Sequence, residues 1–315
     1  DKMSPLSDTT NLAPAMAGTD LITHIKYMMW TTFPSISIAA TAFLVLGFTS
    51  GTGADVEGVE ALQAAIESKF NIGIWLFLVP LAVVLLIWRK VPAIPALLIG
   101  SILGGLFAVI FQPQIIESLA IEGQGYFKAS YMVVIDAMTS DVAISSSNEV
   151  VNELLASNGM MGMMGTIWLI ICAMTFGGVM EASGMLERIA RFILQLAHTT
   201  GSLIASTVGT CLVFNVTASD QYLAIVVPGR MFATEYEKRG LAPENLSRSL
   251  EDSGTVTSAL VPWNTCGAYH AGVLGVATGT YLPFAFFNLI SPFMSMLYGF
   301  MGWKIKKRKP SAVAA

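Results

Sequence analysis

The sequence predicts an all-α protein that crosses a membrane several times, and three observations support this prediction. Hydrophobic residues make up 54% of the 315 residues, charged residues only 12%, and the mean hydropathy is +0.65. A soluble domain carries roughly 25% charged residues, so this chain cannot cover a globular surface with polar groups. Apolar segments of about 20 residues, the length of a spanning helix, recur along the chain. Two further segments of similar length carry polar residues at their centres.

Five segments have the length and composition of a spanning helix: 26–48, 70–88, 92–112, 162–183 and 283–303. Several of them contain proline, for example at Pro80, Pro95 and Pro292. Proline is tolerated in membrane helices because neighbouring groups satisfy the backbone carbonyls that it frees. These segments are therefore expected to form the membrane-spanning scaffold.

Basic residues predict the orientation of the spans. Lys26 precedes the first span, Arg191 follows the fourth, and a basic tail over 304–315 follows the last. Lys and Arg collect on the cytoplasmic side of membrane proteins. With these residues in the cytoplasm, 49–69 and 113–160 become acidic external loops, and the C-terminus is cytoplasmic. The expected location is a bacterial cytoplasmic membrane, and the net charge of −4 argues against a nucleic-acid partner.

The segment 201–232 is interrupted by the polar run 215–220, which leaves two arms of 14 and 12 residues. At 1.5 Å per residue each arm reaches about 20 Å, less than the roughly 30 Å of the hydrocarbon core. Basic residues flank both arms, at Arg191 on one side and Arg230 on the other. A re-entrant hairpin that returns to the cytoplasmic side is the simplest interpretation.

The segment 249–280 is interrupted at 262–267, again near its middle. Because the following span 283–303 ends in the cytoplasm, 249–280 has to cross the membrane, and we expect a discontinuous helix. The start of the chain resembles it, with a polar, proline-containing stretch before the span 26–48. The first unit runs inward and the second outward, so the two are inverted. Inverted repeats with broken helices are typical of secondary transporters.

This pattern predicts four parts: the end of a first inverted repeat (1–48), two spans with external loops (49–160), a second inverted repeat (161–303) and the basic tail (304–315). The second repeat holds the spanning helix, the hairpin, the broken helix and the final span.

Three long motifs carry a family resemblance: DKMSPLSDTTNLAP at 1–14, TASDQY with PGRMF at 217–232, and LEDSGT with VPWNT at 250–265. The chain resembles the NhaC family of sodium/proton antiporters over most of its length. The resemblance implies an ion-transporter fold with inverted repeats and re-entrant hairpins, and a homodimer would suit it. It also implies that the first helices and the first hairpin of the family are missing here. Relatives on the same fold exchange malate for lactate or move amino acids.

Carboxylates inside membrane segments are functional candidates, because burying one costs about 2.5–3.5 kcal/mol on insertion scales. Asp8 and Asp220 lie in polar breaks and are the leading candidates. Asp252 ranks below them and Glu251 lower still, since a carboxylate pair can simply stabilise a helix N-terminus. The neighbouring oxygen donors that suit Na⁺ are Ser7, Thr9, Asn11, Thr217, Ser219, Asn264 and Thr265.

A proton path is a further expectation, with Glu181, Glu251 and His270 as its candidates. Each has an ordinary alternative. Glu181 lies near the cytoplasmic end of its span, where a carboxylate reaches water. Histidine is a common pH sensor, so His270 is a candidate for that role, but a hydrogen-bonded core histidine is the more common alternative.

The predicted function is exchange of Na⁺ (or Li⁺) for H⁺, in which one carboxylate binds either ion. The alternative is a coupled organic-anion or amino-acid exchanger on the same fold. A larger anion would need a cationic group at the midplane, and no Lys or Arg lies inside an apolar span, which favours the small ion. No HExxH or GxSxG motif occurs, so an enzyme is disfavoured and no cofactor is expected. The expected partners are the lipid bilayer, Na⁺ and protons.

Overall fold

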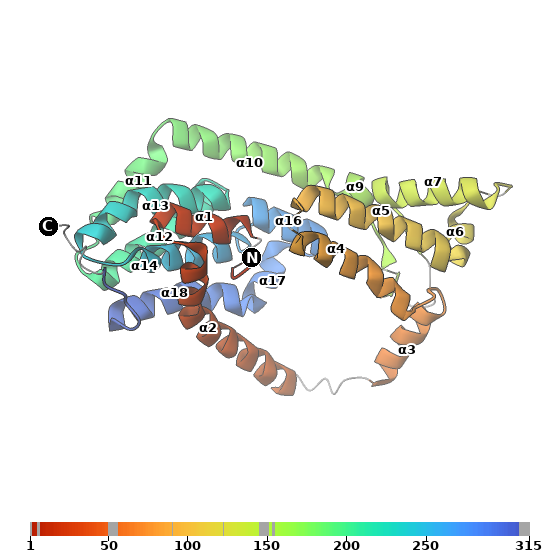
Figure 1. Cartoon of the computed structure of the whole chain (residues 1–315), viewed down its shortest axis with the longest axis horizontal. Helices are drawn as coiled ribbons and strands as arrows, with labels where there is room; N and C mark the ends of the chain where they lie inside the picture. The colour runs from red at the N-terminus through yellow and green to blue at the C-terminus, as the bar shows by residue number, and fades with distance from the viewer. Residues whose placement is uncertain are drawn as a thin grey trace. The chain divides into compact units, whose positions relative to one another are not determined.

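The computed structural model describes residues 2–4, 7–49, 56–89, 91–121, 123–144, 151–152 and 155–308. Over these residues the chain is helical, without strands, and shows only two isolated bridges, Val142 with Ser157 and Leu241 with Lys307. The chain forms two compact units (Figure 1). The terminal unit is Asp1–Ser50 with Gly165–Ala315, and the central unit is Gly51–Met164. Residues 1 and 5–6 of the first motif, and 309–315 of the predicted basic tail, lie outside the described residues.

The central unit contains two apolar helices and several shorter ones: α3 (Val56–Glu67), η1 (Ile74–Phe77), α4 (Leu78–Trp88), α5 (Ala93–Phe111), α6 (Pro113–Leu119), α7 (Tyr126–Thr139) and α9 (Gly159–Gly162). The two expected external loops therefore hold helices. In the second of them, Ala129 and Val133 of α7 pack on Ile116 of α6. These short amphipathic helices lack the 20-residue apolar length on which the prediction of spans relied.

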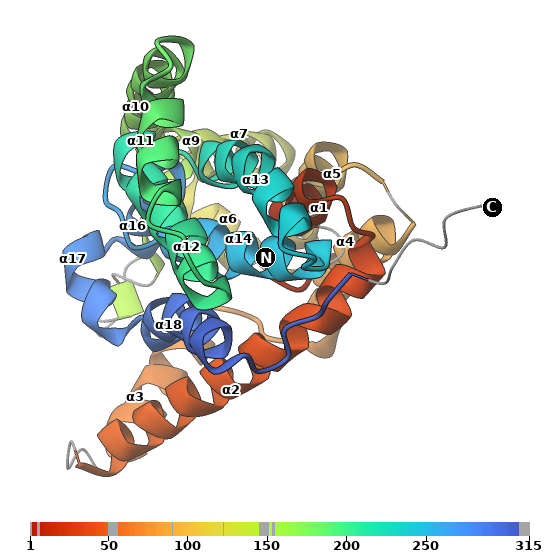
Figure 2. The same cartoon turned by 90° about the vertical axis from the view of Figure 1, so that its left-hand side faces the viewer.

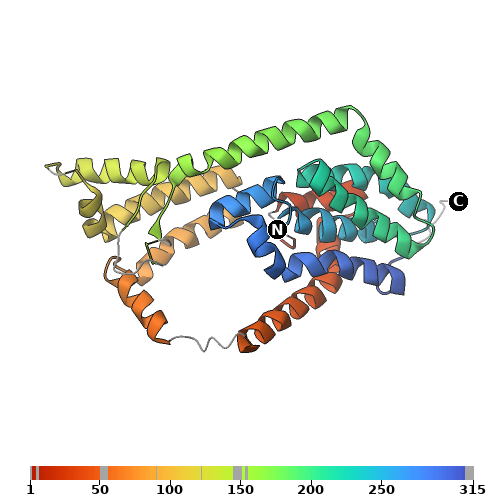
Figure 3. The same cartoon turned by 180° about the vertical axis from the view of Figure 1, so that it is seen from behind.

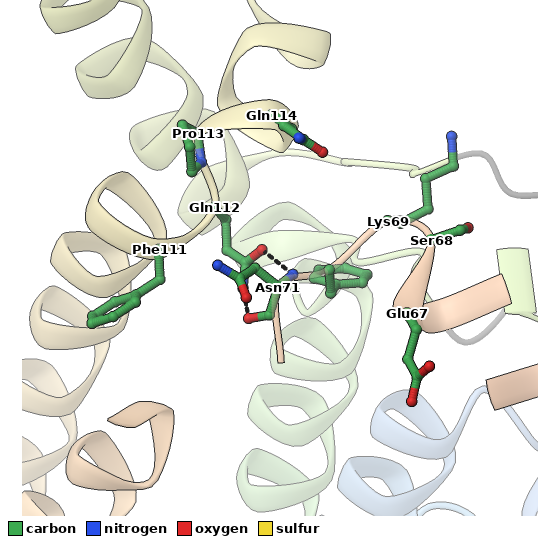
Figure 4. A pocket seen from close by; sticks show the side chains of 9 residues that line it. Glu67, Ser68, Lys69, Asn71, Phe111, Gln112, Pro113 and Gln114 are labelled. Carbon is green, nitrogen blue, oxygen red and sulfur yellow. Dashed lines mark hydrogen bonds between the residues drawn. The ribbon is translucent and has the colours of Figure 1, made fainter. Parts of the chain in front are cut away.

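The ends of α4 and α5 are tied together by one side chain, as Figure 4 shows. Gln112, which follows α5, accepts the Asn71 backbone N–H at 2.8 Å and donates to the Asn71 carbonyl at 2.8 Å. Asn71 lies just before η1, so the amide of Gln112 satisfies two backbone groups that a helix end would leave open. The pair links the segment before η1 to the C-terminal end of α5.

The terminal unit brings together both ends of the chain. Its helices are α1 (Asp8–Ala17), α2 (Leu21–Thr49), α10 (Met164–Ala182, whose first residue closes the central unit), α11 (Met185–Leu194), α12 (Thr200–Thr217), α13 (Gln221–Lys238), α14 (Pro243–Leu250), η2 (Glu251–Thr255), α15 (Val256–Ser258), α16 (Thr265–Leu274), α17 (Thr278–Tyr281), η3 (Leu282–Phe284) and α18 (Phe286–Met301). α12 packs against both α13 and α18, and the side view shows α12 beside α18 (Figure 2).

Four described helices are long and apolar enough to cross a membrane: Leu21–Thr49, Ile94–Phe111, Gly159–Ala182 and Thr200–Thr217. A fifth would come from Thr278–Phe284 and Phe286–Met301, which are bent by 59° at Ala285. The long helix α10 is seen most clearly from behind (Figure 3). These helices make the chain a multi-pass, all-α membrane protein, as the composition predicts. The expected final span 283–303 is a shorter helix of 16 residues after a bend.

The predicted hairpin 201–232 consists of α12 and α13, which are longer than expected at 18 residues each. α12 starts early because Thr199 and Ser202 form a capping box, each side chain bonding the other's backbone N–H. It also continues through Asn215 as far as Thr217. The chain then turns at Ser219, which has a φ of 59°. Each arm is therefore about 27 Å long, and of the two arms only α12 is also apolar enough to be a candidate span among the described helices.

The predicted broken helix also differs in its limits. The helical part begins at Pro243, passes through η2 and ends at Ser258, so the interruption lies at 259–264 and not at 262–267. The helix resumes at Thr265 because the Asn264 side chain accepts the Cys266 N–H at 3.1 Å and caps α16. α16 then ends at Gly275, which has a φ of 65°.

The polar start of the chain forms α1, which packs against α13 and α14 (Figure 1). Ala13 of α1 joins the main hydrophobic core together with Leu203, Ile225 and Leu250. Gly18 ends α1 in the left-handed conformation, with a φ of 84°. Asp20 then accepts the Thr23 N–H at 2.9 Å at the start of α2, and hydrogen bonds from Thr23 lower the pKa of Asp20. The N-terminal segment is therefore an integral part of the terminal unit.

Candidate ion-binding site

Two adjacent carboxylates lie at the centre of the terminal unit. Glu251 and Asp252 are both 0% exposed, and both belong to the single π-helical turn η2. A π-helical turn has one extra residue per turn, and such turns occur frequently at functional sites. Carboxylates are rarely buried without a partner, because the charge loses its hydration. The partners of these two residues therefore decide what the turn can do.

Side chains from neighbouring helices satisfy the backbone of the π-helical turn. The Asn215 amide of α12 donates to the Gly254 carbonyl at 2.8 Å, and Asn288 of α18 donates to the Val256 carbonyl at 2.7 Å. The lack of a side chain at Gly254 is needed for packing, since a Cβ there would lie 2.8 Å from Cγ1 of Ile225. The irregular backbone thus persists because its carbonyls are bonded and its neighbours fit closely.

Asp252 is paired with a lysine from the other end of the chain. Lys2 Nζ lies 2.6 Å from Asp252 Oδ1, and the two side chains are 7% and 0% exposed. Neither oxygen of Asp252 accepts a well-aligned hydrogen bond from any described residue. Lys2 also donates to Ser291 Oγ at 2.8 Å and lies 5.0 Å from the centre of the Phe287 ring. The charge of Lys2 is therefore the main compensation for the charge of Asp252.

Glu251 is bonded to hydroxyl groups of α1. Its Oε1 accepts from Thr10 at 3.3 Å and, more weakly, from Thr9 at 3.5 Å. Thr9 and Thr10 are buried, at 1% and 0% exposure. Thr9 in turn shares a hydrogen bond of 3.0 Å with Ser7. The hydroxyls of Thr9 and Thr10, which follow Asp8, therefore contact Glu251. In the sequence-based order of ion-binding candidates, Glu251 ranks below Asp8, Asp220 and Asp252.

Asp220 and Asp8 lie at the tip of the α12–α13 hairpin and at the first turn of α1. Asp220 is 4% exposed and caps α13, with Oδ1 accepting from the N–H groups of Tyr222 at 2.8 Å and Leu223 at 3.0 Å. Asp8 is exposed on the surface of the terminal unit, and the Tyr222 hydroxyl donates to its Oδ2 at 3.4 Å. The Asn11 amide donates to the Ser7 carbonyl at 2.7 Å. Asp220 thus has the contacts of a helix cap.

The two polar interruptions of the second half meet in space. Thr265 N–H donates to the Ser219 carbonyl at 3.1 Å, and the Trp263 indole donates to the Val216 carbonyl at 2.8 Å. The Asn264 amide reaches both the carbonyl and the side-chain oxygen of Asn215, each at 3.1 Å. The tip of the hairpin and the break before α16 are thereby joined.

The remaining candidate residues form no hydrogen bond or ion pair with Glu251 or Asp252 that the structure describes. The Thr217 hydroxyl bonds the Val213 carbonyl of its own helix at 2.8 Å, and the Thr265 hydroxyl bonds Asn264 Oδ1 at 3.3 Å. Glu181 is exposed near the end of α10. His270 is also exposed, so it is not a core histidine. Its ring packs edge-on against Tyr269, and it lines a pocket of about 710 Å³ to which Lys2 also contributes.

Sequence reasoning missed three buried basic residues. Besides Lys2, the Arg248 guanidinium is 0% exposed and lies 4.6 Å from the Tyr27 ring and 5.7 Å from the Tyr298 ring. His24 is also 0% exposed and bonds Ser247 Oγ at 2.8 Å through Nδ1. Lys2 and Arg248 lie outside the five expected apolar spans, as the sequence indicates, but both are buried in this unit. Arg248 lies four residues before Asp252, a helical spacing that could have signalled it.

Chemically, the site offers two buried carboxylates, hydroxyl and amide oxygens, and one lysine ammonium. Carboxylate and hydroxyl oxygens suit hard cations and protons. Over the described residues no group of three or more His, Cys, Asp or Glu side chains could hold a metal ion. The fold and the site together define a multi-pass α-helical membrane protein with buried ionisable groups between irregular helices.

Comparison with known proteins places the chain within that class. A family model described as the Na⁺/H⁺ antiporter family matches residues 1–303, and the chain belongs to this family. It is 36% identical over 312 residues to the Na⁺/H⁺ antiporter NhaC of Alkalihalophilus pseudofirmus, covering 99% of this chain. It is 35% identical over 302 residues to NhaC of Bacillus subtilis, covering 96% of this chain.

A third relative has a different named activity. The malate-2H⁺/Na⁺-lactate antiporter of Bacillus subtilis is 31% identical over 317 residues and covers 100% of this chain. The chain spans about 64% of the length of each of these three relatives. No solved structure matches the chain.

Proposed function

We propose that the protein exchanges Na⁺ (or Li⁺) for H⁺ across the bacterial cytoplasmic membrane. One observation carries the proposal: Glu251 and Asp252 are adjacent, fully buried and contacted by the N-terminal segment through Thr10 and Lys2. A buried carboxylate binds either a proton or a cation to offset its charge, and competition between the two couples their movements. Membership of the Na⁺/H⁺ antiporter family supports the same conclusion.

Within this proposal, Asp252 and Glu251 bind the exchanged ions. The polar residues of α1, of the α12–α13 hairpin tip and of the break before α16 line the route by which the ions reach these two carboxylates. The route would comprise Asp8, Asp220, Ser7, Thr9, Asn11, Thr217, Ser219, Asn264 and Thr265. The hydrogen bonds between the tip and the break before α16 support this grouping. His270 and Glu181, both exposed, are proposed to exchange protons with water at the two ends of the path.

The membrane arrangement is also a proposal. Residues 1–48 would form the end of a first inverted repeat and 161–303 the second, with 49–160 between them and a basic cytoplasmic tail from 304. Basic residues at both outer ends of the α12–α13 pair, Arg191 and Lys238, support a re-entrant hairpin that opens to the cytoplasm. The length of α12 is the observation that opposes it, because 18 residues nearly suffice to cross. We further propose a homodimer that needs no cofactor, with the lipid bilayer, Na⁺ and protons as its other partners and no nucleic acid among them.

A second candidate function is a coupled exchange of organic anions. Lys2 and His270 line the pocket of about 710 Å³ together with Gln221, at the start of α13, and Thr265, at the start of α16. A cationic side chain beside two helix N-termini is an arrangement that binds carboxylates. The relative named for malate and lactate supports this alternative. Against it, the ammonium of Lys2 is already paired with Asp252.

Flux through the complete protein in proteoliposomes separates the two functions. With a pH-sensitive dye inside and no organic solute, an inward Na⁺ gradient should alkalinise the lumen. An equal choline gradient and protein-free liposomes are the controls. Flux that appears only when malate, lactate or an amino acid is added would favour the second function and rule out simple Na⁺/H⁺ exchange.

A further inference from the structure

The ammonium group of Lys2 has three partners, and they differ in kind. It forms an ion pair with Asp252 at 2.6 Å, donates to Ser291 Oγ at 2.8 Å and lies over the Phe287 ring at 5.0 Å. The pair is buried, so little water is available to replace either partner. Removing one member of a buried ion pair leaves the other charge uncompensated. Any cation that binds Asp252 must therefore take the place of Lys2.

We propose that the Lys2 ammonium competes with transported Na⁺ for Asp252, so that Lys2 sets the Na⁺ affinity of the site. The inference rests on the proposed function, since it assumes that Asp252 binds the transported ion. Both competitors are monovalent cations that pair with carboxylate oxygens. A resident lysine weakens Na⁺ binding by the free energy needed to displace it, and it neutralises Asp252 whenever Na⁺ is absent.

The displaced ammonium of Lys2 keeps other contacts in the structure. Ser291 Oγ and the Phe287 ring both belong to α18, and neither contact requires Asp252. One turn further along α18, Ser295 is 0% exposed and its hydroxyl has no hydrogen-bond partner among the described residues. Lys2 can therefore leave the carboxylate without leaving the site. Lys2 also lines the pocket of about 710 Å³, so this member of the pair is reached from the pocket.

The other buried cation is placed differently. Arg248 is held between the Tyr27 and Tyr298 rings and donates to the Lys304 carbonyl at 3.3 Å. No ion pair joins Arg248 to a described carboxylate. His24 is bonded through Nδ1 to Ser247 Oγ. Lys2 is therefore the side chain whose charge Na⁺ would replace at Asp252.

Direct binding of ²²Na⁺ to the complete protein in detergent tests the competition. Lys2→Met keeps a long apolar side chain and removes the charge, and its dissociation constant for Na⁺ should fall by about tenfold or more. Lys2→Arg keeps the charge and should not tighten binding. Lys26→Met is the matched control, because Lys26 is exposed at the start of α2 and should leave binding unchanged. A folded Lys2→Met protein that binds Na⁺ with wild-type or weaker affinity would overturn the proposal.

A second measurement uses the unaltered protein and does not depend on the folding of a variant. Reductive methylation followed by mass spectrometry reports how accessible the Lys2 amine is. Saturating Na⁺ should raise the methylation of Lys2 severalfold over an equal concentration of choline, while Lys26 stays constant as the internal control. Methylation of Lys2 that does not respond to bound Na⁺ overturns the competition.

The two measurements also separate this inference from the proposed function. If the unaltered protein binds Na⁺ but Lys2 neither responds to it nor controls its affinity, the inference alone fails. If the unaltered protein binds Na⁺ in competition with Lys2 but moves no protons, the proposed exchange fails and the inference stands. If it binds no Na⁺ at all, both fail.

Discussion

The hairpin tip and the π-helical turn each contain carboxylates among polar neighbours, yet they treat the charge in opposite ways. At the tip, Asp220 bonds two N–H groups of α13, and Asp8 is exposed. In the turn, Glu251 and Asp252 are wholly buried, and their contacts come from Thr10 and Lys2, about 240–250 residues away in sequence. At the tip the charge of Asp220 caps the start of α13, whereas the charges in the π-helical turn are compensated by residues far away in sequence.

This difference shows how to separate a structural carboxylate from one that can carry an ion. A capping carboxylate accepts hydrogen bonds from the backbone of the helix that it caps, and the stability of the protein changes little when Asn replaces Asp. A buried carboxylate with one cationic partner depends on charge, so Asn is a poor substitute. Substitutions that remove a charge, remove a hydrogen bond or overpack a close contact test this difference between the hairpin tip and the π-helical turn.

The largest effect is expected for Asp252→Asn. The substitution leaves Lys2 buried without a counter-charge, which costs about 3–5 kcal/mol of stability. It should also reduce Na⁺-driven proton movement to the level of protein-free liposomes, because the charge that binds the cation is gone. Thermal unfolding in detergent and dye-based flux measure the two consequences. The double variant Lys2→Met with Asp252→Asn should regain most of the stability but none of the flux, and full flux in either protein would remove Asp252 from the site.

Asn215→Ala tests the link between the two regions. It removes the amide that bonds the Gly254 carbonyl and also the oxygen that Asn264 contacts. Each buried group left without a partner costs about 1–3 kcal/mol, so the melting temperature should fall clearly. Gln63→Ala is the control, because its exposed bond to Glu67 contributes little. Equal melting temperatures in the two variants would mean that the turn does not depend on the hairpin.

Gly267→Ala tests the packing of the break before α16. A Cβ at this position would lie 2.0 Å from the Val261 carbonyl oxygen, and a backbone atom cannot move aside easily. Overpacking of this kind costs about 1–3 kcal/mol, measured as a loss of thermal stability. Gly279→Ala adds the same methyl group where nothing lies within 4 Å and should be neutral. If both variants melt alike, the break has more freedom than its contacts indicate.

The smallest effects are expected at Asp220. Asp220→Ala should lose about 1 kcal/mol, because the cap of α13 disappears, while Asp220→Asn should lose only a fraction of this. Na⁺-driven flux should persist in both variants. Loss of all flux in a stable Asp220→Asn protein would show that the tip carries the ion, and the contrast between the two regions would have to be reversed.

The sequence predicted the regular parts of this fold well, because a long apolar helix depends on its own composition. The spans at α2, α5 and α10 follow from length alone. The polar runs also located both interruptions to within a few residues. They could not give the helix limits: α12 continues through Asn215 because that amide finds acceptors in η2 and not in its own helix.

The site was harder to predict for a related reason. Asp8 and Asp220 stood out because their neighbours in sequence are polar. Glu251 and Asp252 resembled an ordinary helix N-terminus, and no periodicity marks a π-helical turn. Lys2 looked peripheral, since nothing near it in sequence discloses a partner 250 residues later. Local patterns therefore predict local contacts, and this site consists mainly of distant ones.

The separation of Lys2 from Asp252 also determines the order of events during biosynthesis. The ribosome adds about 5–20 residues per second, so Lys2 is made roughly 12–50 s before its partner 250 residues later. During that time the Asp252 carboxylate is not yet available to pair with its ammonium. The ion pair can form only after Asp252 has been synthesised, and the contacts of Lys2 with Phe287 and Ser291 need residues that are made later still.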